Sequence, residues 1–294
     1  MAGVDTYRVS GARKIARAVL PGGVRAYLQA GINAVHEATF KLHGTPPRSV
    51  RLAISPVWFD FKKAGRDQLE FLTELAGIRP SDKVLDIACG VGRLAIPLTR
   101  FLNEDGRYEG FDADPSGIAW CKKNIGSRNK KFHFTAADVR TALSPGASQT
   151  AEDFVFPYGN SYFDIVYAGS IFTHLRPDAA RNYLKQTKRV LKPGGRLVAT
   201  WNVYNKKYEG LNGRQTAVAK HWQFDHGNHK FKSEEFPEEN IAYDVDFLRE
   251  LYSEAELTVI EPFRGDASYC PARIPADRAV GMHLYHTSSV IAVL

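Results

Sequence analysis

The stretch VLDIACGVGRLAIPL, residues 84–98, determines which fold we expect for this chain of 294 residues. An apolar run with a single acid, Asp86, leads to two glycines, Gly90 and Gly92, and then to apolar residues at helical spacing. This order predicts a buried strand, a tight turn and a helix. Glycines in such a turn allow the backbone to approach a ligand closely. We therefore expect a ligand-binding site where this strand ends.

Further apolar runs repeat the strand signal along the chain. They are RYEGFDA (107–113), KFHFTAAD (131–138), FDIVYAGS (163–170), GRLVATW (195–201), LTVIEPF (257–263) and SSVIAVL (288–294). Helical patterns separate several of them, and another, RDQLEFLTELAG (66–77), precedes the first strand and has Gly77 as its C-terminal cap. Strands that alternate with helices are typical of an α/β fold, with a parallel sheet and helices on both faces.

The pattern also divides the chain. Residues 1–64 are predicted to form a helical extension or cover, because apolar residues recur at helical spacing between Val24 and Val35. Residues 65–294 are predicted to form the main domain. Within it, residues 202–240 interrupt the alternation, since they are polar, aromatic and histidine-bearing. We interpret them as an insertion or lid after the fifth strand.

Charge and cysteine content limit the environment of the protein. The net charge is +7, and residues 1–51, here called the basic arm, contribute +6 of it through eight basic and two acidic side chains. We interpret the arm either as a solvated face or as a contact for an anionic membrane surface, nucleic acid or an acidic substrate. Three cysteines lack metal-type spacing, and no apolar run approaches the ~18 residues of a membrane span. These features predict a reduced, cytoplasmic protein.

Three acids at the ends of the first three predicted strands indicate the chemistry of the ligand. Asp86 would repel a pyrophosphate and attract an ammonium or sulfonium group, so a dinucleotide is disfavoured although GVGRLA satisfies the loose dinucleotide pattern. Asp112 follows the glycines by about 20 residues, where an acid can accept both hydroxyls of a ribose. Asp138 can accept from an adenine amino group. A cation, a ribose and an adenine together describe S-adenosylmethionine.

Residues 65–201 resemble a class I S-adenosylmethionine-dependent methyltransferase. VLDIACGVGR resembles the glycine motif of that family, GFDADP its ribose-binding acid and AADV its adenine site. FPYGNSYFDIVYAGSIFTHL and YLKQTKRVLKPGGRLVATW resemble its fourth strand, the following helix and an LKPGG turn. The resemblance implies a Rossmann-like, seven-stranded, mostly parallel sheet and a methyl transfer that leaves S-adenosylhomocysteine.

The same resemblance implies a set of cofactor-binding residues. Asp86 would bind the methionine amine, Asp112 the ribose, and Asp138 with Val139 the adenine. The remaining expected cofactor contacts are Ala88, Cys89, Gly90, Gly92, Arg93, Ala113 and Ser170. Family members often carry glycine where Ala88 stands, so we expect slight tightening of the site at this residue.

Two histidines are candidates for removing a proton from a methyl acceptor. His174 follows the fourth predicted strand, and His226 lies in the insertion beside Asp225, which can orient its ring. A metal held by His226, His229 and Asp225 is an alternative, but the ligand set is incomplete, so no metal is predicted.

The acceptor is predicted to be a small hydroxylated molecule, such as a sugar, a glycolipid or a secondary metabolite. Aromatic side chains in the predicted pocket segments favour it, although such residues more often belong to the core: Trp58, Phe59, Phe61, Trp201, Tyr204, Tyr208, Trp222 and Phe224. A nucleic-acid or protein methyltransferase that uses the basic arm stays open as an alternative, although no Asn/Asp-Pro-Pro-Tyr motif follows DIVYAGS and nucleic acid is not favoured. A non-catalytic S-adenosylmethionine-binding protein also stays open, as does the oligomeric state, a homodimer included.

Overall fold

The computed structural model describes residues 46, 60–141, 144–206, 222–264 and 287–294. The chain divides into two compact units, Met1–Lys62 and Lys63–Leu294, and the second is described below. The helix expected between Val24 and Val35 and the basic arm, apart from Pro46, lie outside the described residues, and the domain boundary at residue 64 stays a prediction. None of the described helices is both long and apolar enough to cross a membrane.

Helices and strands alternate through the domain, as the sequence predicts. The first half contains α4 (Phe61–Phe71), the π-helical segment η1 (Leu72–Ala76), β1 (Lys83–Ile87), α5 (Ala95–Phe101), β2 (Arg107–Asp112), α6 (Pro115–Asn124), the 3-10 turn η2 (Gly126–Arg128), β3 (Phe132–Ala136) and β4 (Phe163–Ala168). The second half contains α7 (Pro177–Val190), β5 (Leu191–Tyr204), β6 (Phe224–Asp225), β7 (His229–Phe231), η4 (Pro237–Glu239), β8 (Ile241–Asp244), α9 (Val245–Glu254), β9 (Thr258–Arg264) and β10 (Thr287–Val293). The predicted cap is confirmed, because Gly77 is left-handed (φ 60°) and its N–H donates to the Leu72 carbonyl.

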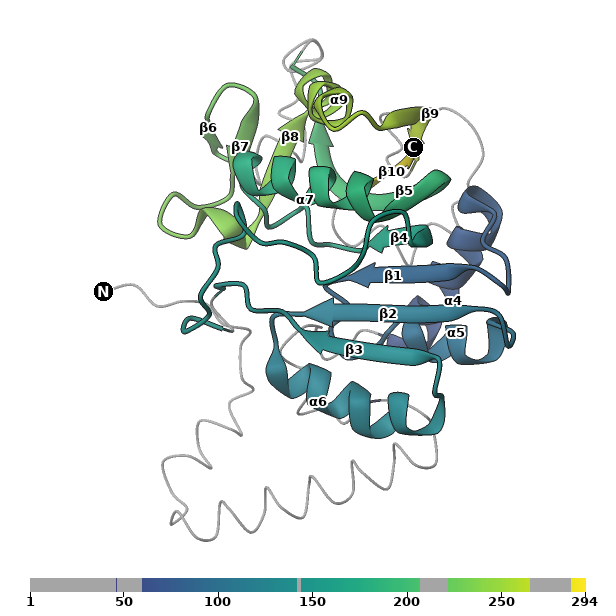
Figure 1. Cartoon of the computed structure of the whole chain (residues 1–294). Helices are drawn as coiled ribbons and strands as arrows, with labels where there is room; N and C mark the ends of the chain where they lie inside the picture. Colours follow the sequence, from purple (N-terminus) through teal and green to yellow (C-terminus); the bar gives the residue numbers. More distant parts are fainter. Residues whose placement is uncertain (1–45, 47–59, 142–143, 207–221, 265–286) are drawn as a thin grey trace, which may run out of the picture. The chain divides into compact units, whose positions relative to one another are not determined.

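One mixed sheet contains all of the described strands. Its central order is β3-β2-β1-β4-β5, and these five strands are parallel. Figure 1 shows β1, β2 and β3 side by side, with α6 next to β3. β10 pairs antiparallel with β5, and β9 pairs antiparallel with β10. This path of seven strands confirms the predicted Rossmann-like sheet, and β8, β7 and β6 extend it to ten strands within the described part of the chain.

Helices cover both faces of the sheet, because neighbouring residues of a strand point to opposite sides. Val84 of β1 packs in one core cluster with Leu98 of α5 and Cys121 of α6. Its neighbour Leu85 packs in a second core cluster with Leu184 of α7. Strands that are buried on both faces have nearly continuous apolar sequences. The first half of VLDIACGVGR is therefore apolar on both sides of Asp86.

β5 extends beyond the strands that precede it in the sheet. The last residue pair between β4 and β5 is Ala168 with Ala199, yet β5 continues to Tyr204. At about 3.3 Å per residue, this extension reaches roughly 16 Å past the end of β4. β8 pairs with the extension at Asn202–Tyr204, and the β6–β7 hairpin pairs with β8. The described part of the predicted insertion thus adds the short β6–β7 hairpin to the sheet, beyond the carboxyl ends of the parallel strands.

Candidate active site

The turn after β1 lies at the carboxyl edge of the sheet, between β2 and β4. Open α/β sheets bind ligands at this kind of position, where the strand order changes direction. Gly90 (φ 54°) and Gly92 (φ 74°) both have left-handed backbones, which glycine adopts at little cost. Ala88 is also left-handed (φ 57°). The cost of alanine at this position is therefore backbone strain, since its Cβ approaches the following carbonyl.

Asp86 is a buried acid near the end of β1. It is 3% exposed, and its Oδ2 atom accepts a hydrogen bond of 2.7 Å from the Tyr108 hydroxyl on β2. Burial raises the pKa of Asp86 to about 7, although the Tyr108 hydrogen bond and the charge of Arg93 act in the opposite direction. Because desolvation disfavours the ionised carboxylate, a cation that binds beside Asp86 would stabilise it.

Asp112 joins the end of β2 to the glycine turn. Its Oδ2 atom accepts from the Gly90 N–H and its Oδ1 atom from the Asp114 N–H, both at 2.8 Å. Burial raises the pKa of Asp112 in spite of these bonds. An ionised carboxylate has about four acceptor positions. The N–H of the half-buried Ala113 is a third backbone donor to this carboxylate, so about one acceptor position remains for a ribose hydroxyl.

Asp138 follows β3 and is exposed. Its carboxylate accepts from the Ser148 hydroxyl and from the Ser148 N–H, the latter at 2.8 Å, and these bonds lower the pKa of Asp138. The Ala137 N–H donates to the Asp112 carbonyl at 2.9 Å, which keeps the ends of β2 and β3 together. Val139 is buried and forms a bridge with Gln149. The adenine-binding role of Asp138 and Val139 stays a prediction.

Cys89 and Arg93 belong to the same turn. Cys89 is 5% exposed, and burial raises the pKa of its thiol, so the side chain is a neutral thiol inside the turn. Arg93 is half-buried, and its charge opposes the rise that burial causes in the pKa values of Asp86 and Tyr167. Arg93 thus supplies positive charge beside Asp86.

The loop after β4 holds two of the predicted residues at the same edge. Ser170 is left-handed (φ 69°), and its N–H donates to the Thr200 Oγ1 atom at 2.6 Å. His174 is exposed, and its Nδ1 atom lies 2.9 Å from the Glu238 carbonyl oxygen. A carbonyl oxygen can only accept a hydrogen bond, so Nδ1 carries the hydrogen. In the neutral ring, Nε2 of His174 is then the basic nitrogen.

The insertion packs against this loop. The Ile241 N–H donates to the Thr173 carbonyl at 2.8 Å, and the Tyr243 hydroxyl donates to the Leu175 carbonyl at 2.5 Å. Together with the His174–Glu238 contact, these bonds connect η4 and β8 to the segment that follows β4. These contacts hold η4 and β8 beside the loop that carries Ser170 and His174.

The β6–β7 hairpin places His226 next to His229, with ring centroids 5.4 Å apart. Asp225 accepts from the Gly227 N–H at 2.8 Å, and one of its oxygens lies 3.3 Å from Lys230 Nζ. Among the described residues, the Asp225 carboxylate makes these contacts rather than a hydrogen bond to the His226 ring. No cluster of three His, Cys, Asp or Glu suited to a metal ion is found in the described part of the chain.

The aromatic residues expected around the acceptor have different positions. Trp201 is fully buried, stacks on Phe172 at 4.2 Å between ring centroids, and donates to the Tyr252 hydroxyl at 3.0 Å, so it belongs to the core. Trp222 is also buried and donates to Asn240 Oδ1 at 3.0 Å. Trp58, Phe59 and Tyr208 lie outside the described residues.

Sequence reasoning missed three partners of the site: Tyr108, Thr200 and the Glu238 carbonyl. Tyr108 lies in an apolar strand run, so its pattern indicates only core. Thr200 is likewise a strand residue, and a backbone carbonyl produces no sequence signal. Only the folded chain brings these groups to Asp86, Ser170 and His174.

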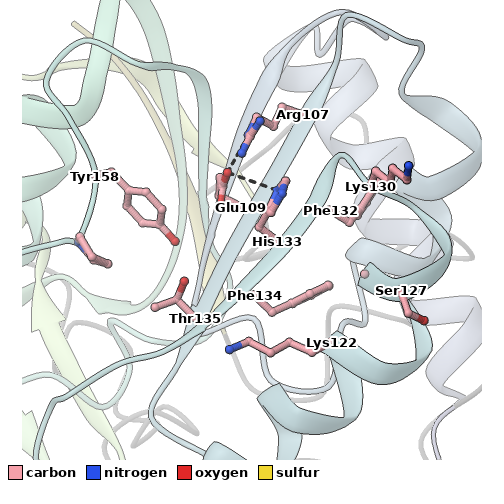
Figure 2. Close-up of a pocket in the computed structure, with 12 residues that line it drawn as sticks. Arg107, Glu109, Lys122, Ser127, Lys130, Phe132, His133, Phe134, Thr135 and Tyr158 are labelled. Atoms are coloured by element: carbon pink, nitrogen blue, oxygen red, sulfur yellow. Dashed lines mark hydrogen bonds and ion pairs between the residues drawn. The ribbon is translucent and has the colours of Figure 1, made fainter.

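A pocket of about 600 Å³ lies elsewhere, beside the edge strand β3 (Figure 2). Its lining includes Arg107, Glu109 and His133, where Glu109 lies 2.7 Å from Arg107 and 3.5 Å from His133. Lys122 approaches from α6, and Tyr158 lies on the other side. None of the residues predicted to bind cofactor or acceptor lines this pocket. It is therefore separate from the candidate active site.

Comparison with known proteins agrees with this geometry. A family model described as a methyltransferase domain matches residues 84–195. The 27-O-demethylrifamycin SV methyltransferase of Amycolatopsis mediterranei is 30% identical over 144 residues, which cover 48% of this chain and 47% of that protein. The ubiquinone/menaquinone biosynthesis C-methyltransferase UbiE of Azotobacter vinelandii is 32% identical over 130 residues, covering 44% and 45%. The chain thus spans about half the length of these curated relatives.

A solved structure, that of the PH0226 protein from Pyrococcus horikoshii, shares the fold. Its TM-score is 0.50 at 16% sequence identity, and the match covers 82% of this chain and 96% of that one. The family match covers the glycine turn, Asp112, Asp138 and the segment through α7, and it ends within β5. With the parallel sheet and the acids at its carboxyl edge, residues 84–195 are a methyltransferase domain of the class I S-adenosylmethionine-dependent family.

Proposed function

We propose that this protein transfers the methyl group of S-adenosylmethionine to a hydroxyl oxygen of a small acceptor, such as a sugar, a glycolipid or a secondary metabolite. The observation that carries the proposal is the contact between His174 Nδ1 and the Glu238 carbonyl. It selects the tautomer in which Nε2 can accept a proton, at the edge of the sheet where the methyl group is expected. An alcohol needs such a base, because its oxygen is a weak nucleophile while it keeps its proton.

The residues at the carboxyl edge fit the cofactor. Asp86 is a buried acid for the ammonium group, and Arg93 is the nearby cation for the carboxylate. Asp112 keeps an acceptor position for a ribose hydroxyl while it holds the backbone of Gly90, Ala113 and Asp114. When bound, S-adenosylmethionine supplies an electrophilic methyl group on a sulfonium.

The protein contributes positioning and proton transfer. Methyl transfer is an in-line displacement, so a fixed alignment of the acceptor oxygen supplies much of the rate. The hydrogen bonds that β8 donates to the Thr173 and Leu175 carbonyls hold the loop that carries His174. His174 Nε2 takes the hydroxyl proton while Nδ1–H stays bonded to the Glu238 carbonyl, which stabilises the imidazolium that forms.

The relatives support methylation without deciding the acceptor atom. One is named for an O-demethylated antibiotic and another is named a C-methyltransferase. The fixed tautomer of His174 suits an oxygen acceptor, because the hydroxyl must lose its proton to the base as the methyl group moves. The polar and aromatic insertion beside the edge supports a small polyhydroxylated ligand.

The test is a screen for S-adenosylhomocysteine release with sugars, glycolipids and phenolic metabolites as acceptors. With an acceptor found, His174→Ala should lower turnover by roughly 100- to 10,000-fold and leave cofactor affinity nearly unchanged. His226→Ala tests the second predicted base. His133→Gln is the matched control, because His133 lies in the β3 pocket and should keep full activity. Near-full activity of His174→Ala would rule out its role as base.

A further inference from the structure

We propose that Tyr108 is a positioning residue of the cofactor site, whose hydroxyl holds the buried Asp86 carboxylate ready to bind the ammonium group of the cofactor. The inference rests on the proposed function, since it assumes that S-adenosylmethionine binds at this edge. It assigns a role to a residue on the neighbouring strand, away from the glycine turn.

The strand register explains how the two side chains meet. Asp86 is paired with Gly110, and Val84 with Tyr108, so Tyr108 starts two residues before the level of Asp86 on the adjacent strand. A Cβ atom at Gly110 would lie 2.8 Å from the Tyr108 hydroxyl and 2.9 Å from Cys89 Sγ. Gly110 therefore leaves the space through which the tyrosine reaches Asp86. The hydroxyl donates to Asp86 Oδ2 at 2.7 Å.

The tyrosine ring has little freedom to move. It is fully buried, stacks on Phe132 with centroids 5.1 Å apart, and lies 5.4 Å from the Phe134 ring. Both phenylalanines belong to β3, and Ile118 and Cys121 of α6 lie in the same core cluster as the ring. A ring fixed in this way presents its hydroxyl in one place, and the Asp86 carboxylate is oriented with it.

The other groups around Asp86 do not replace this contact. Arg93 follows the turn and contributes positive charge, while Asp112 at the end of β2 contributes negative charge. Cys89 in the turn, Cys121 on α6 and Tyr167 on β4 also interact electrostatically with Asp86. Among the described residues, Tyr108 is the one that donates a side-chain hydrogen bond to this carboxylate.

A hydrogen bond from a neutral hydroxyl favours the ionised form of its acceptor. Burial acts in the opposite direction and raises the pKa of Asp86 to about 7. Without the hydroxyl, the pKa should rise further, by about one to two pH units for one hydrogen bond to a charged group. Since the ammonium group binds the ionised carboxylate, cofactor affinity at pH 7 should fall by about five- to fifty-fold. At a pH above the Asp86 pKa of both proteins, with and without the Tyr108 hydroxyl, the loss of cofactor affinity should disappear.

The experiment measures the dissociation constant of S-adenosylhomocysteine by calorimetry between pH 6 and 9.5. Tyr108→Phe keeps the stacked ring and removes only the hydroxyl. Tyr252→Phe is the matched control, because it removes a buried hydroxyl bonded to Trp201 in the opposite core cluster. The ligand amine titrates identically with each protein, so a difference between variants reports on the protein.

In Tyr108→Phe, the pH dependence of cofactor affinity should shift to higher pH. In Tyr252→Phe it should stay as in the wild type. In an Asp86→Asn background, Tyr108→Phe should leave the pH dependence unchanged. Gly110→Ala is a second variant, since its Cβ would displace the same hydroxyl and should move the profile in the same direction. An unchanged profile, or equal weakening at every pH, would overturn the inference. Failure of the wild type to bind either adenosyl ligand would instead overturn the proposed function.

Discussion

Replacing Asp86 by asparagine should stabilise the cofactor-free protein at neutral and alkaline pH while it weakens cofactor binding. The folded pKa of Asp86 is raised to about 7 from the ordinary value of 3.8. The folded state therefore binds this proton more tightly than the unfolded state does, so the contribution of Asp86 is most favourable below pH 3.8 and is lost as pH rises through 7. At about 1.4 kcal/mol for each pH unit between the two values, the loss reaches about 4 kcal/mol above pH 7.

Asparagine has no such loss, because it is neutral at every pH and its Oδ1 atom can still accept from the Tyr108 hydroxyl. The stability advantage of Asp86→Asn should therefore grow from about 1.6 kcal/mol at pH 5 to about 4 kcal/mol at pH 8. Urea unfolding of both proteins without cofactor, at each pH unit from 5 to 8, measures this difference.

Glu256→Gln provides the opposite control. Its hydrogen bond with Lys188 lowers the pKa of Glu256, so its contribution is present above the unfolded pKa and is lost as pH falls. Glu256→Gln should be slightly less stable than the wild type at pH 8, with the difference shrinking toward pH 4. A stability difference for Asp86→Asn that is the same at pH 5 and pH 8 would refute the reasoning about its burial.

Other changes test the same edge of the sheet. Asp112→Asn should weaken cofactor binding at least about tenfold and lower the free energy of unfolding by about 1–3 kcal/mol. The Gly90 and Asp114 N–H groups bond to different oxygens of Asp112, and an asparagine amide has only one oxygen. Calorimetry measures the binding effect and urea unfolding the stability effect. Ala88→Gly should raise the free energy of unfolding by about 0.5–1 kcal/mol, because relief of the left-handed strain exceeds the entropy that glycine adds to the unfolded chain. An unchanged midpoint of urea unfolding would contradict this. From its charge alone, the basic arm should bind anionic vesicles at low salt and release them at high salt, and equal sedimentation with neutral vesicles would count against membrane contact.

The order of elements could be predicted from the sequence because it depends on local patterns. Residues 84–98 contain strand, turn and helix signals in a row, and burial of strands on both faces makes each later strand an apolar run. The positions of Asp86, Asp112 and Asp138 could be predicted for the same reason, because each acid lies near the carboxyl end of a strand and these ends meet at one edge of a parallel sheet. The structure brings Asp86 and Asp112 close enough to interact electrostatically, and it bonds Asp112 to Gly90 of the turn.

The insertion shows where local patterns end. Residues 202–240 have no clear periodicity, and β6 and β7 contain two and three residues, too few to produce a strand signal. Their pairing depends on β8 and on the part of β5 that passes the end of β4. His174 is a candidate base from its place after the fourth strand, whereas its tautomer depends on a carbonyl 64 residues away along the chain.

The sequence by itself determined the α/β class, the carboxyl-edge acids and the methyltransferase motifs, because strand burial and turn geometry act over a few neighbouring residues. Only the tertiary structure decided the hydrogen bond from Tyr108 to Asp86, the left-handed strain of Ala88 and the orientation of the His174 ring. Each of these depends on atoms that are distant in sequence or on backbone angles set by packing. The physical reason is that pKa values and ring orientation respond to burial and to nearby partners, and both are absent until the sheet has formed.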